Sequence, residues 1–424
     1  MTRKHPRLAA GLHSAVQLAT GLLLAAGLAS AHAADPLKIG FGMSMTGPLA
    51  GNGKAALLAM EIWRDDVNAK GGLLGRKVEF VTYDDQTNPS TVPGIYNKLL
   101  DIDKVDIIMS GYGTNVIAPA IPIAMQRKMV LMSLFGTDVN AKFKYDGYFQ
   151  IMPNGADPSL GLVNGFFEIA AAMKPKAQTV ALVGADAEYP HAALEGARRS
   201  VKNHKMKIVY DKTYPPNTTD CAPIIRAIQA TNPDVVFVAS YPPDSACIVR
   251  AANEVGLKTK QFGGPMIGLG YAALKTQLGP LLNGMTSWEL YVPEPTIKFP
   301  FIKEFLAKYQ PRAATEKLDP LGFYLPPYAY AQMQIVGEAI QKVGSLDQGK
   351  IAKYIHANKF STVVGDVSFA KNGEWAVGRP LYVQYRGIVG NDLEQWKQPG
   401  KAVVVWPASL KSGEHRYPYD QNRK

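Results

Sequence analysis

The chain has 424 residues and a formal net charge of +11, from 46 lysines and arginines against 35 acidic residues. The excess positive charge is spread along the chain, and no basic patch is interleaved with aromatic residues, so the sequence gives no indication of nucleic-acid binding. The length is sufficient for two domains.

The chain begins with the pattern of an export signal. Arg3, Lys4 and Arg7 precede an apolar run that ends at Ala31-His32-Ala33, which is typical of a secretory signal peptide with an A-x-A cleavage site. An anchoring transmembrane helix is the alternative, but the apolar run over residues 21–31 is short for one. We therefore expect residues 1–33 to be removed near Ala33, which would leave a periplasmic protein.

From Leu37 onward, short apolar runs alternate with stretches of helical periodicity. This alternation predicts strands joined by right-handed helical crossovers, and hence a parallel sheet. The pattern restarts after Met152-Pro153-Asn154, so the sequence predicts two doubly wound lobes. The strands expected in the first lobe are KIGFGMS, KVEFVTYDD, VDIIMSG and KMVLMSLFG, and those expected in the second are TVALVGAD, MKIVYDKTY, PDVVFVASY and KQFGG.

After Gly284 the pattern changes to short helices separated by prolines. A long helix is expected over residues 326–343, and the alternating runs PLYVQYRGI and AVVVWP read as late strands that could join either lobe. The residues from Ala408 onward are polar, and we expect them to extend over the surface.

Motifs that resemble enzyme signatures are each incomplete. Gly111-Tyr112-Gly113 begins like a dinucleotide fingerprint, but Val116 occupies its third glycine position. Residues 48–55 imitate a phosphate-binding loop, yet proline replaces the first glycine and alanine replaces the magnesium-binding hydroxyl residue. Asp84-Asp85 is better explained as a turn than as an acid–base pair. No metal-binding histidine spacing occurs, so we expect neither an enzyme nor a cofactor or metal.

The chain contains two cysteines, Cys221 and Cys247. Each stands near the expected start of a helix, on either side of one strand, and an exported chain permits oxidation. A disulfide between them is favoured slightly over two buried free thiols.

Ligands of open α/β sheets bind at the carboxyl ends of the strands. In the first lobe these ends carry Thr114 and Thr137, each beside glycine and near an expected helix start, where free amides favour an anion. Two such loops on neighbouring strands predict a carboxylate site, although each threonine could simply cap its helix. In the second lobe, Tyr189 and Tyr241 stand at strand ends and could either close over a ligand or pack in the core.

The sequence also resembles a known family. The stretch MSMTGPLAGNGKAALLAMEIWRDDVNAKGGLLGRKVEFVTYDDQTNP is similar to the amino-terminal signature of periplasmic binding proteins of the branched-chain amino acid importers. The segments TVALVGADAEYP, NTTDCAPIIRAIQATNPDVVFVASYPPD and NEVGLKTKQFGGP continue the similarity over nearly all of the mature chain. The resemblance implies the type I binding-protein fold, in which two Rossmann-like lobes joined by three crossovers close on a solute and deliver it to an ABC permease in the inner membrane.

On this resemblance, lobe 1 comprises residues 34–152 plus 286–363, and lobe 2 comprises residues 153–285 plus 364–405. Residues 406–424 form a C-terminal tail, and we expect a monomer. An exported α/β enzyme acting on a small carboxylate and a ligand-sensing module are the alternatives.

The resemblance also implies a ligand pocket. Thr114 and Thr137 match positions whose hydroxyls hold the ligand carboxylate, with backbone groups of Phe135 and Gly136 assisting. Tyr189 and Tyr241 match aromatic positions of the closing lobe. Asn52 occupies a place where leucine-type binders of the family carry an aromatic residue, and Phe323 falls near a side-chain-pocket position.

Met266 departs from the family pattern, because amino-acid binders of the family place a glutamate there to pair with the ligand ammonium. An ammonium enclosed without an acceptor costs several kcal/mol. Either another acid substitutes, for which Asp138, Asp186 and Asp244 are the candidates, or the ligand carries no ammonium. Met266 together with Phe135, Tyr112, Tyr189 and Tyr241 describes an apolar cleft, which favours a hydrophobic organic acid over an amino acid by a small margin.

Overall fold

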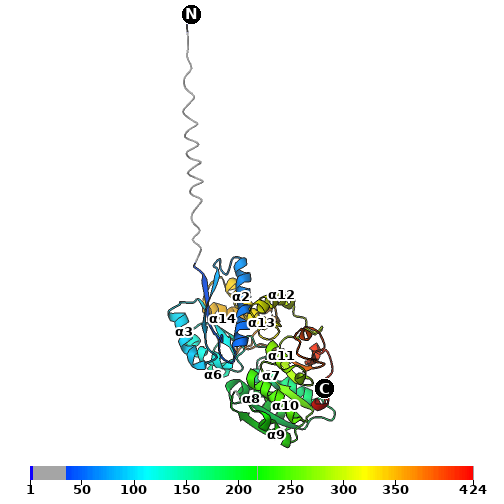
Figure 1. Ribbon diagram of the computed structural model, residues 1–424. Coiled ribbons are helices and arrows are strands. Elements are labelled where there is room, and N and C mark those ends of the chain that lie inside the picture. The colour runs from blue at the N-terminus through cyan, green and yellow to red at the C-terminus, as the bar shows by residue number, and fades with distance from the viewer. Residues whose placement is uncertain (3–34, 217, 424) are drawn as a thin grey trace.

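The computed structural model describes residues 1–2, 35–216 and 218–423. The predicted signal peptide therefore lies outside the described residues, apart from its first two. Figure 1 shows two lobes, one built mainly from the blue and cyan early part of the chain and one from the green middle part. Along the described ranges, no helix combines the length and the apolar character needed to cross a membrane.

The first lobe is built on a five-stranded parallel sheet in the order β2-β1-β3-β4-β5. Four of its strands are largely or fully buried, as a sheet covered on both faces requires, whereas the edge strand β2 is mostly half-buried. The strands are β1 (Leu37–Met43), β2 (Val78–Asp84), β3 (Ile107–Tyr112), β4 (Leu131–Leu134) and β5 (Tyr148–Gln150). The helices between them are α2 (Ala50–Ala69), α3 (Val92–Asp101), α4 (Thr114–Ile117), α5 (Ile121–Gln126) and α6 (Asn140–Phe143).

The second lobe is built on a seven-stranded sheet in the order β14-β13-β10-β9-β8-β6-β7. Its strands are β6 (Thr179–Ala185), β7 (Lys207–Tyr214), β8 (Val235–Ala239), β9 (Gln261–Gly264), β10 (Thr286–Glu289), β13 (Leu381–Tyr385) and β14 (Ala402–Trp406). The first five are parallel and repeat the strand order of the first lobe, while β13 and β14 add antiparallel strands at one edge. The helices are α7 (Pro158–Ala171), α8 (Glu188–Asn203), α9 (Ala222–Ala230), α10 (Pro242–Val255) and α11 (Ala272–Leu278).

The predicted lobe boundary at residue 286 differs from the structure. Strand β10 pairs in parallel with β9 and so belongs to the second sheet, whereas the sequence analysis placed it in the first lobe. All four of its residues are buried, so the strand shows no alternation that could reveal it. The chain then returns to the first lobe with α12 (Ile302–Thr315), α13 (Pro326–Val343), α14 (Gln348–Ala357) and the hairpin of β11 (Phe360–Thr362) with β12 (Gly365–Val367).

The C-terminal tail does not extend freely over the surface as expected. The side chain of Tyr419, in the short helix α15 (Tyr419–Asn422), is fully buried with its ring centroid 5.1 Å from that of Phe262. The side chain of Gln384 in β13 accepts a hydrogen bond from the Arg416 amide at 2.9 Å and donates one to the Arg416 carbonyl at 2.6 Å. The tail is therefore packed against the second lobe, and its polar composition concealed one buried aromatic anchor.

The structure joins Cys221 to Cys247 in a disulfide with an S–S distance of 2.02 Å. Cys221 precedes the first residue of α9, and Cys247 lies in α10. The favoured alternative of the sequence analysis is thus the one observed.

Candidate ligand site between the lobes

A cavity lies where the carboxyl ends of the parallel strands of the two sheets face each other, as the strand-end rule predicts for this topology. Its free volume for water-sized molecules is only about 20 Å³, so the two lobes pack against each other more tightly here than a bound organic molecule would allow. Most of its lining residues are aromatic or apolar. They are Leu49, Tyr112, Gly113, Thr114, Phe135, Thr137, Met152, Tyr189, Tyr241, Ile267, Trp288 and Tyr324.

Phe135 occupies the centre of an aromatic cluster to which both lobes contribute. Its ring centroid lies 6.3 Å from those of both Tyr112 and Trp288 and 6.0 Å from that of Tyr324. Phe135 has φ of +68°, a left-handed conformation that is unfavourable for a bulky residue. Gln150, at the end of β5, holds this conformation in place because its side-chain oxygen accepts a hydrogen bond from the Phe135 amide at 3.0 Å.

The two predicted threonines meet in the cavity. The Thr137 amide donates a hydrogen bond to the Thr114 hydroxyl oxygen at 3.1 Å, which leaves the Thr114 O–H proton available to another acceptor. The Thr137 hydroxyl lies 3.6 Å from the sulfur of Met152, a weak acceptor. Helix α4, which Thr114 begins, is only one turn long. An anion here would therefore depend on the hydroxyls and local amides, and the expected helix dipole contributes little.

The second lobe covers the cavity with a pair of tyrosines whose ring centroids are 5.8 Å apart. The Tyr189 hydroxyl donates to the Pro265 carbonyl at 2.5 Å, which is a bond within the second lobe. The Tyr241 hydroxyl donates instead to the Asn115 side-chain oxygen of the first lobe at 3.2 Å. Tyr241 therefore joins the two lobes directly when they are closed.

Six of the predicted residues line the cavity, namely Tyr112, Thr114, Phe135, Thr137, Tyr189 and Tyr241. Asn52 lies one layer behind, where its amide is 3.4 Å from the Tyr112 hydroxyl. Burial raises the pKa of Tyr112 to about 12, so this hydroxyl stays protonated at neutral pH. Gly136 is also behind the lining, and its carbonyl accepts a hydrogen bond from the Gln150 side chain at 2.6 Å.

Met266 and Phe323 are buried but do not line the cavity. Their immediate neighbours Ile267 and Tyr324 line it instead. The side chain at position 267 is aliphatic, and the absence of a glutamate at this part of the cavity therefore persists after the correction.

Trp288 is a lining residue that the sequence analysis missed, because it belongs to the unrecognised strand β10. Its indole N–H is buried and has no hydrogen-bond acceptor among the residues that the structure describes. Buried donors usually have partners. This N–H is therefore a candidate donor to a bound ligand.

None of the three acids considered as ammonium partners lines the cavity. Asp244 is buried and accepts hydrogen bonds from the Tyr214 hydroxyl at 2.6 Å and from the Tyr241 amide at 3.2 Å. Asp186 pairs with His191 at 2.8 Å near the surface, and Asp138 accepts from the Ser159 hydroxyl at 3.1 Å. Within the described ranges, all residues that line the cavity are uncharged, so a ligand ammonium would lack an anionic partner.

Two doubly wound α/β lobes that close over an aromatic cavity are the architecture of the bilobal solute-binding proteins. The comparisons agree with this class. A family model described as "Periplasmic binding protein" matches residues 36–385, and the chain belongs to this family.

Its relatives include the leucine-, isoleucine-, valine-, threonine- and alanine-binding protein of Pseudomonas aeruginosa, which is 28% identical over 82% of this chain and 90% of its own length. The leucine-specific-binding protein of Salmonella typhimurium is also 28% identical, over 80% of this chain and 88% of its own.

Solved structures show the same fold at lower identity. A leucine binding protein from Thermotoga maritima superimposes with a TM-score of 0.71 at 20% identity, covering 84% of this chain and 96% of its own. A solute binding protein of an ABC transporter from R. palustris, in complex with benzoate, gives 0.70 at 17% identity, covering 87% and 95%.

Proposed function

We propose that the protein is the periplasmic receptor of an ABC importer, and that it captures a small aromatic or aliphatic carboxylic acid that carries no ammonium group. The observation that supports this ligand class is the lining of the interlobe cavity, which combines several aromatic rings with hydroxyl and indole donors and contains no acidic side chain. The name of the Pseudomonas relative supports a branched-chain amino acid, and the benzoate complex supports an aromatic acid.

In this proposal each lobe contributes a distinct part of binding. The carboxylate accepts hydrogen bonds from the Thr114 and Thr137 hydroxyls, and the apolar part of the acid contacts Phe135 and Trp288. Tyr241 then closes from the second lobe and bonds to Asn115. Because the ligand contacts both lobes, binding favours the closed state, which the inner-membrane permease would recognise.

The experiment is a thermal-shift and calorimetric panel on ligand-stripped protein. It compares matched pairs, such as benzoate with phenylalanine and 4-methylpentanoate with leucine, which differ in the α-ammonium group. We expect the acids to raise the melting temperature and the amino acids to have a much smaller effect. Stabilisation by leucine or phenylalanine alone would overturn the proposed ligand class, and no stabilisation by any member would overturn the receptor proposal.

The receptor is proposed to act without chemistry and as a monomer. The bound acid should be recovered unchanged after incubation with the purified protein, and light scattering should give one chain mass with and without ligand. Consumption of the acid would support the alternative of an exported enzyme. Release of residues 1–33 in the exported protein is checked by its intact mass.

A further inference from the structure

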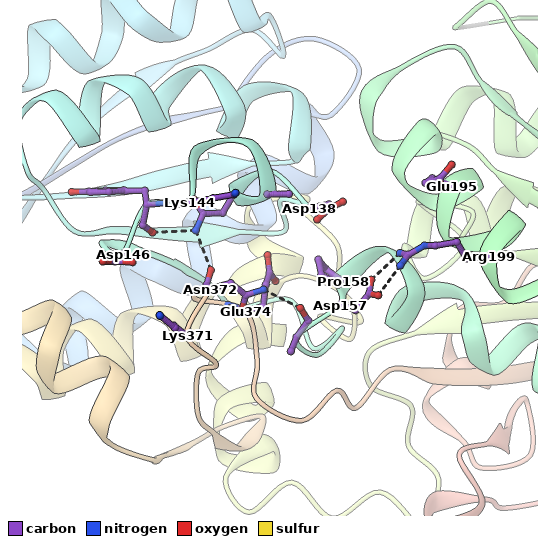
Figure 2. Close-up of a pocket in the computed structure, with 14 residues that line it drawn as sticks. Asp138, Lys144, Asp146, Asp157, Pro158, Glu195, Arg199, Lys371, Asn372 and Glu374 are labelled. Atoms are coloured by element: carbon purple, nitrogen blue, oxygen red, sulfur yellow. Dashed lines mark hydrogen bonds and ion pairs between the residues drawn. The ribbon is translucent and has the colours of Figure 1, made fainter. Parts of the chain in front are cut away.

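A second cavity, which we call the outer cavity, is lined by residues of both lobes and shares no lining residue with the inner one (Figure 2). It has a volume of about 740 Å³, within the range of small-molecule sites. Its walls come from four places: the region of α6 in the first lobe, the start of α7, one face of α8, and the loop of residues 371–374 that follows the first-lobe hairpin.

Glu374 is the feature of this cavity that requires an explanation. Its side chain is only 2% exposed, and its Oε2 atom has no hydrogen-bond partner in the described part of the chain. Figure 2 shows its carboxylate pointing into the space between Asp138 and Pro158. A buried carboxylate without a donor is costly, and burial together with the charge of Asp138 raises the pKa of Glu374 well above its usual range.

The backbone fixes Glu374 in this position from both lobes. The Asn140 side chain of the first lobe donates to the Asn372 carbonyl at 3.0 Å, and the Asn372 side chain donates to the Ala156 carbonyl at 2.9 Å at the entrance to the second lobe. The Gln150 amide donates to the Gly373 carbonyl at 2.8 Å. Gly373 has φ of +78°, and a Cβ there would lie 1.9 Å from the Tyr148 carbonyl oxygen, so the loop approaches β5 as closely as glycine permits.

The charges around Glu374 are not balanced within the cavity. Arg199 is already engaged by Asp157, with two nitrogen–oxygen distances of 2.7 and 2.8 Å. Asp138 faces the same space as Glu374, while Lys144 and Lys371 are exposed at the rim. Among the described residues, no group of three side chains has the arrangement of a metal site. Glu374, whose Oε2 lacks a donor among the described residues, and Asp138, whose donor is the neutral Ser159 hydroxyl, therefore suit a cation that brings its own hydrogen-bond donors.

We propose that this outer cavity is a second binding site, for a small organic amine whose ammonium group binds between Glu374 and Asp138. An ammonium carries three donors and a charge, and so satisfies both carboxylates at once. The site is distinct from the proposed carboxylate site in chemistry and position. The two share the loop of residues 135–138, which presents Phe135 and Thr137 to the inner cavity and Asp138 to the outer one.

The test is calorimetry with putrescine and n-butylamine on the purified protein at neutral pH and low salt. Butane-1,4-diol and succinate serve as uncharged and anionic controls of similar length. We expect saturable binding of one amine per chain and no binding of either control. Absence of saturable amine binding would overturn the proposal, irrespective of how the inner cavity responds to acids.

Matched variants locate the site. Glu374→Gln keeps the shape of the side chain and should weaken amine binding by roughly 10-fold or more, since a charge-assisted bond is lost. Glu195 is an exposed residue of the same cavity, and Glu195→Gln should change the amine affinity by less than roughly 3-fold. Equal affinities of wild type and Glu374→Gln would overturn the assignment. If Glu374→Gln does not fold, Asp138→Asn is tested in its place. An amine affinity equal to that of the wild type in Asp138→Asn would likewise overturn the assignment.

Discussion

Asp319 is a buried carboxyl group on the segment between α12 and α13. One of its oxygens accepts the Leu321 amide at 3.1 Å, and the other has no partner among the described residues. Burial raises its pKa from 3.8 to about 6. The folded protein therefore binds the carboxyl proton of Asp319 more tightly than the unfolded chain does. The contribution of the protonated side chain to the free energy of unfolding is present at low pH and is lost as the pH rises from about 4 to about 6.

Asp319→Asn should remove this dependence, because the amide stays uncharged at every pH. At about pH 7.5 the variant is expected to be more stable than the wild type by up to about 3 kcal/mol, and at about pH 4 the two should be nearly equal. Urea unfolding at both pH values measures the difference. Asp366→Asn, at an exposed side chain, is the control, and an Asp319→Asn variant with the wild-type pH profile would contradict the argument.

The loop after β9 offers a test of ligand specificity at single-residue resolution. Ile267 lines the inner cavity, whereas its neighbour Met266 is buried elsewhere. Ile267→Glu should therefore introduce an anionic partner and shift preference towards α-amino acids, with acid binding weakened by several-fold or more. Met266→Glu should leave the order of ligand affinities unchanged, measured on the folded fraction of the purified variant. A specificity shift produced by Met266→Glu alone would restore the position expected from the family resemblance. Competition calorimetry with an acid and its amino-acid counterpart provides the measurement.

These residues also indicate how far sequence can predict a site. Thr114 and Thr137 could be placed at this cavity from sequence because carboxyl ends of parallel strands converge at one edge of a sheet, whatever the details of the loops. Trp288 was missed because β10 is buried at every position and therefore lacks a periodic signal. Ile267 and Tyr324 line the cavity next to the residues expected there, since loop registers depend on tertiary contacts that no local pattern encodes.

At the scale of elements, the disulfide connects the start of α9 to the interior of α10 across a sequence separation of 26 residues. Closing a loop of this length restricts the unfolded chain and should stabilise the fold by roughly 3 to 4 kcal/mol. The double substitution Cys221→Ser with Cys247→Ser should lower the free energy of unfolding by about this amount. Denaturant unfolding of the two proteins measures the loss.

A reducing agent supplies the control for the disulfide. It should lower the stability of the wild type towards that of the double variant and leave the variant itself unchanged. Equal stabilities of oxidised wild type and double variant would mean that the bond contributes nothing. Its position was predictable from sequence because both cysteines flank one strand, but the choice between a bond and two thiols required the distance between α9 and α10.

At the scale of the whole molecule, the two doubly wound lobes were predictable because each strand–helix unit is local in sequence. The lobe to which each C-terminal element returns was not predictable from sequence. Strands β13 and β14 extend the second sheet, and α13 packs against α2 in the first lobe. These placements depend on contacts between residues far apart in the sequence, such as Thr286 with Gln384 and Met60 with Gln332, so alternating runs near the C-terminus fit either lobe equally well until the packing is known.

Closure of the lobes gives the last prediction, which compares two tyrosines of the second lobe. The Tyr241 hydroxyl bonds across to Asn115, whereas the Tyr189 hydroxyl bonds within its own lobe to Pro265. Only the bond from Tyr241 to Asn115 is expected to form on closing. Tyr241→Phe should therefore weaken binding of the acid that the thermal-shift panel identifies by about 1 kcal/mol, roughly 5-fold. Tyr189→Phe should mainly lower the stability of the ligand-free protein, because its bond is present in open and closed forms alike.

Calorimetry and small-angle X-ray scattering separate the two effects. Saturating acid should reduce the radius of gyration of the wild type, and Tyr241→Phe should need a higher acid concentration to reach the same compact form. The Tyr189→Phe variant should reach it at concentrations closer to those of the wild type. Equal losses of affinity in both variants would mean that the bond to Asn115 has no special role in closure, and that the contacts with the ligand itself hold the lobes together.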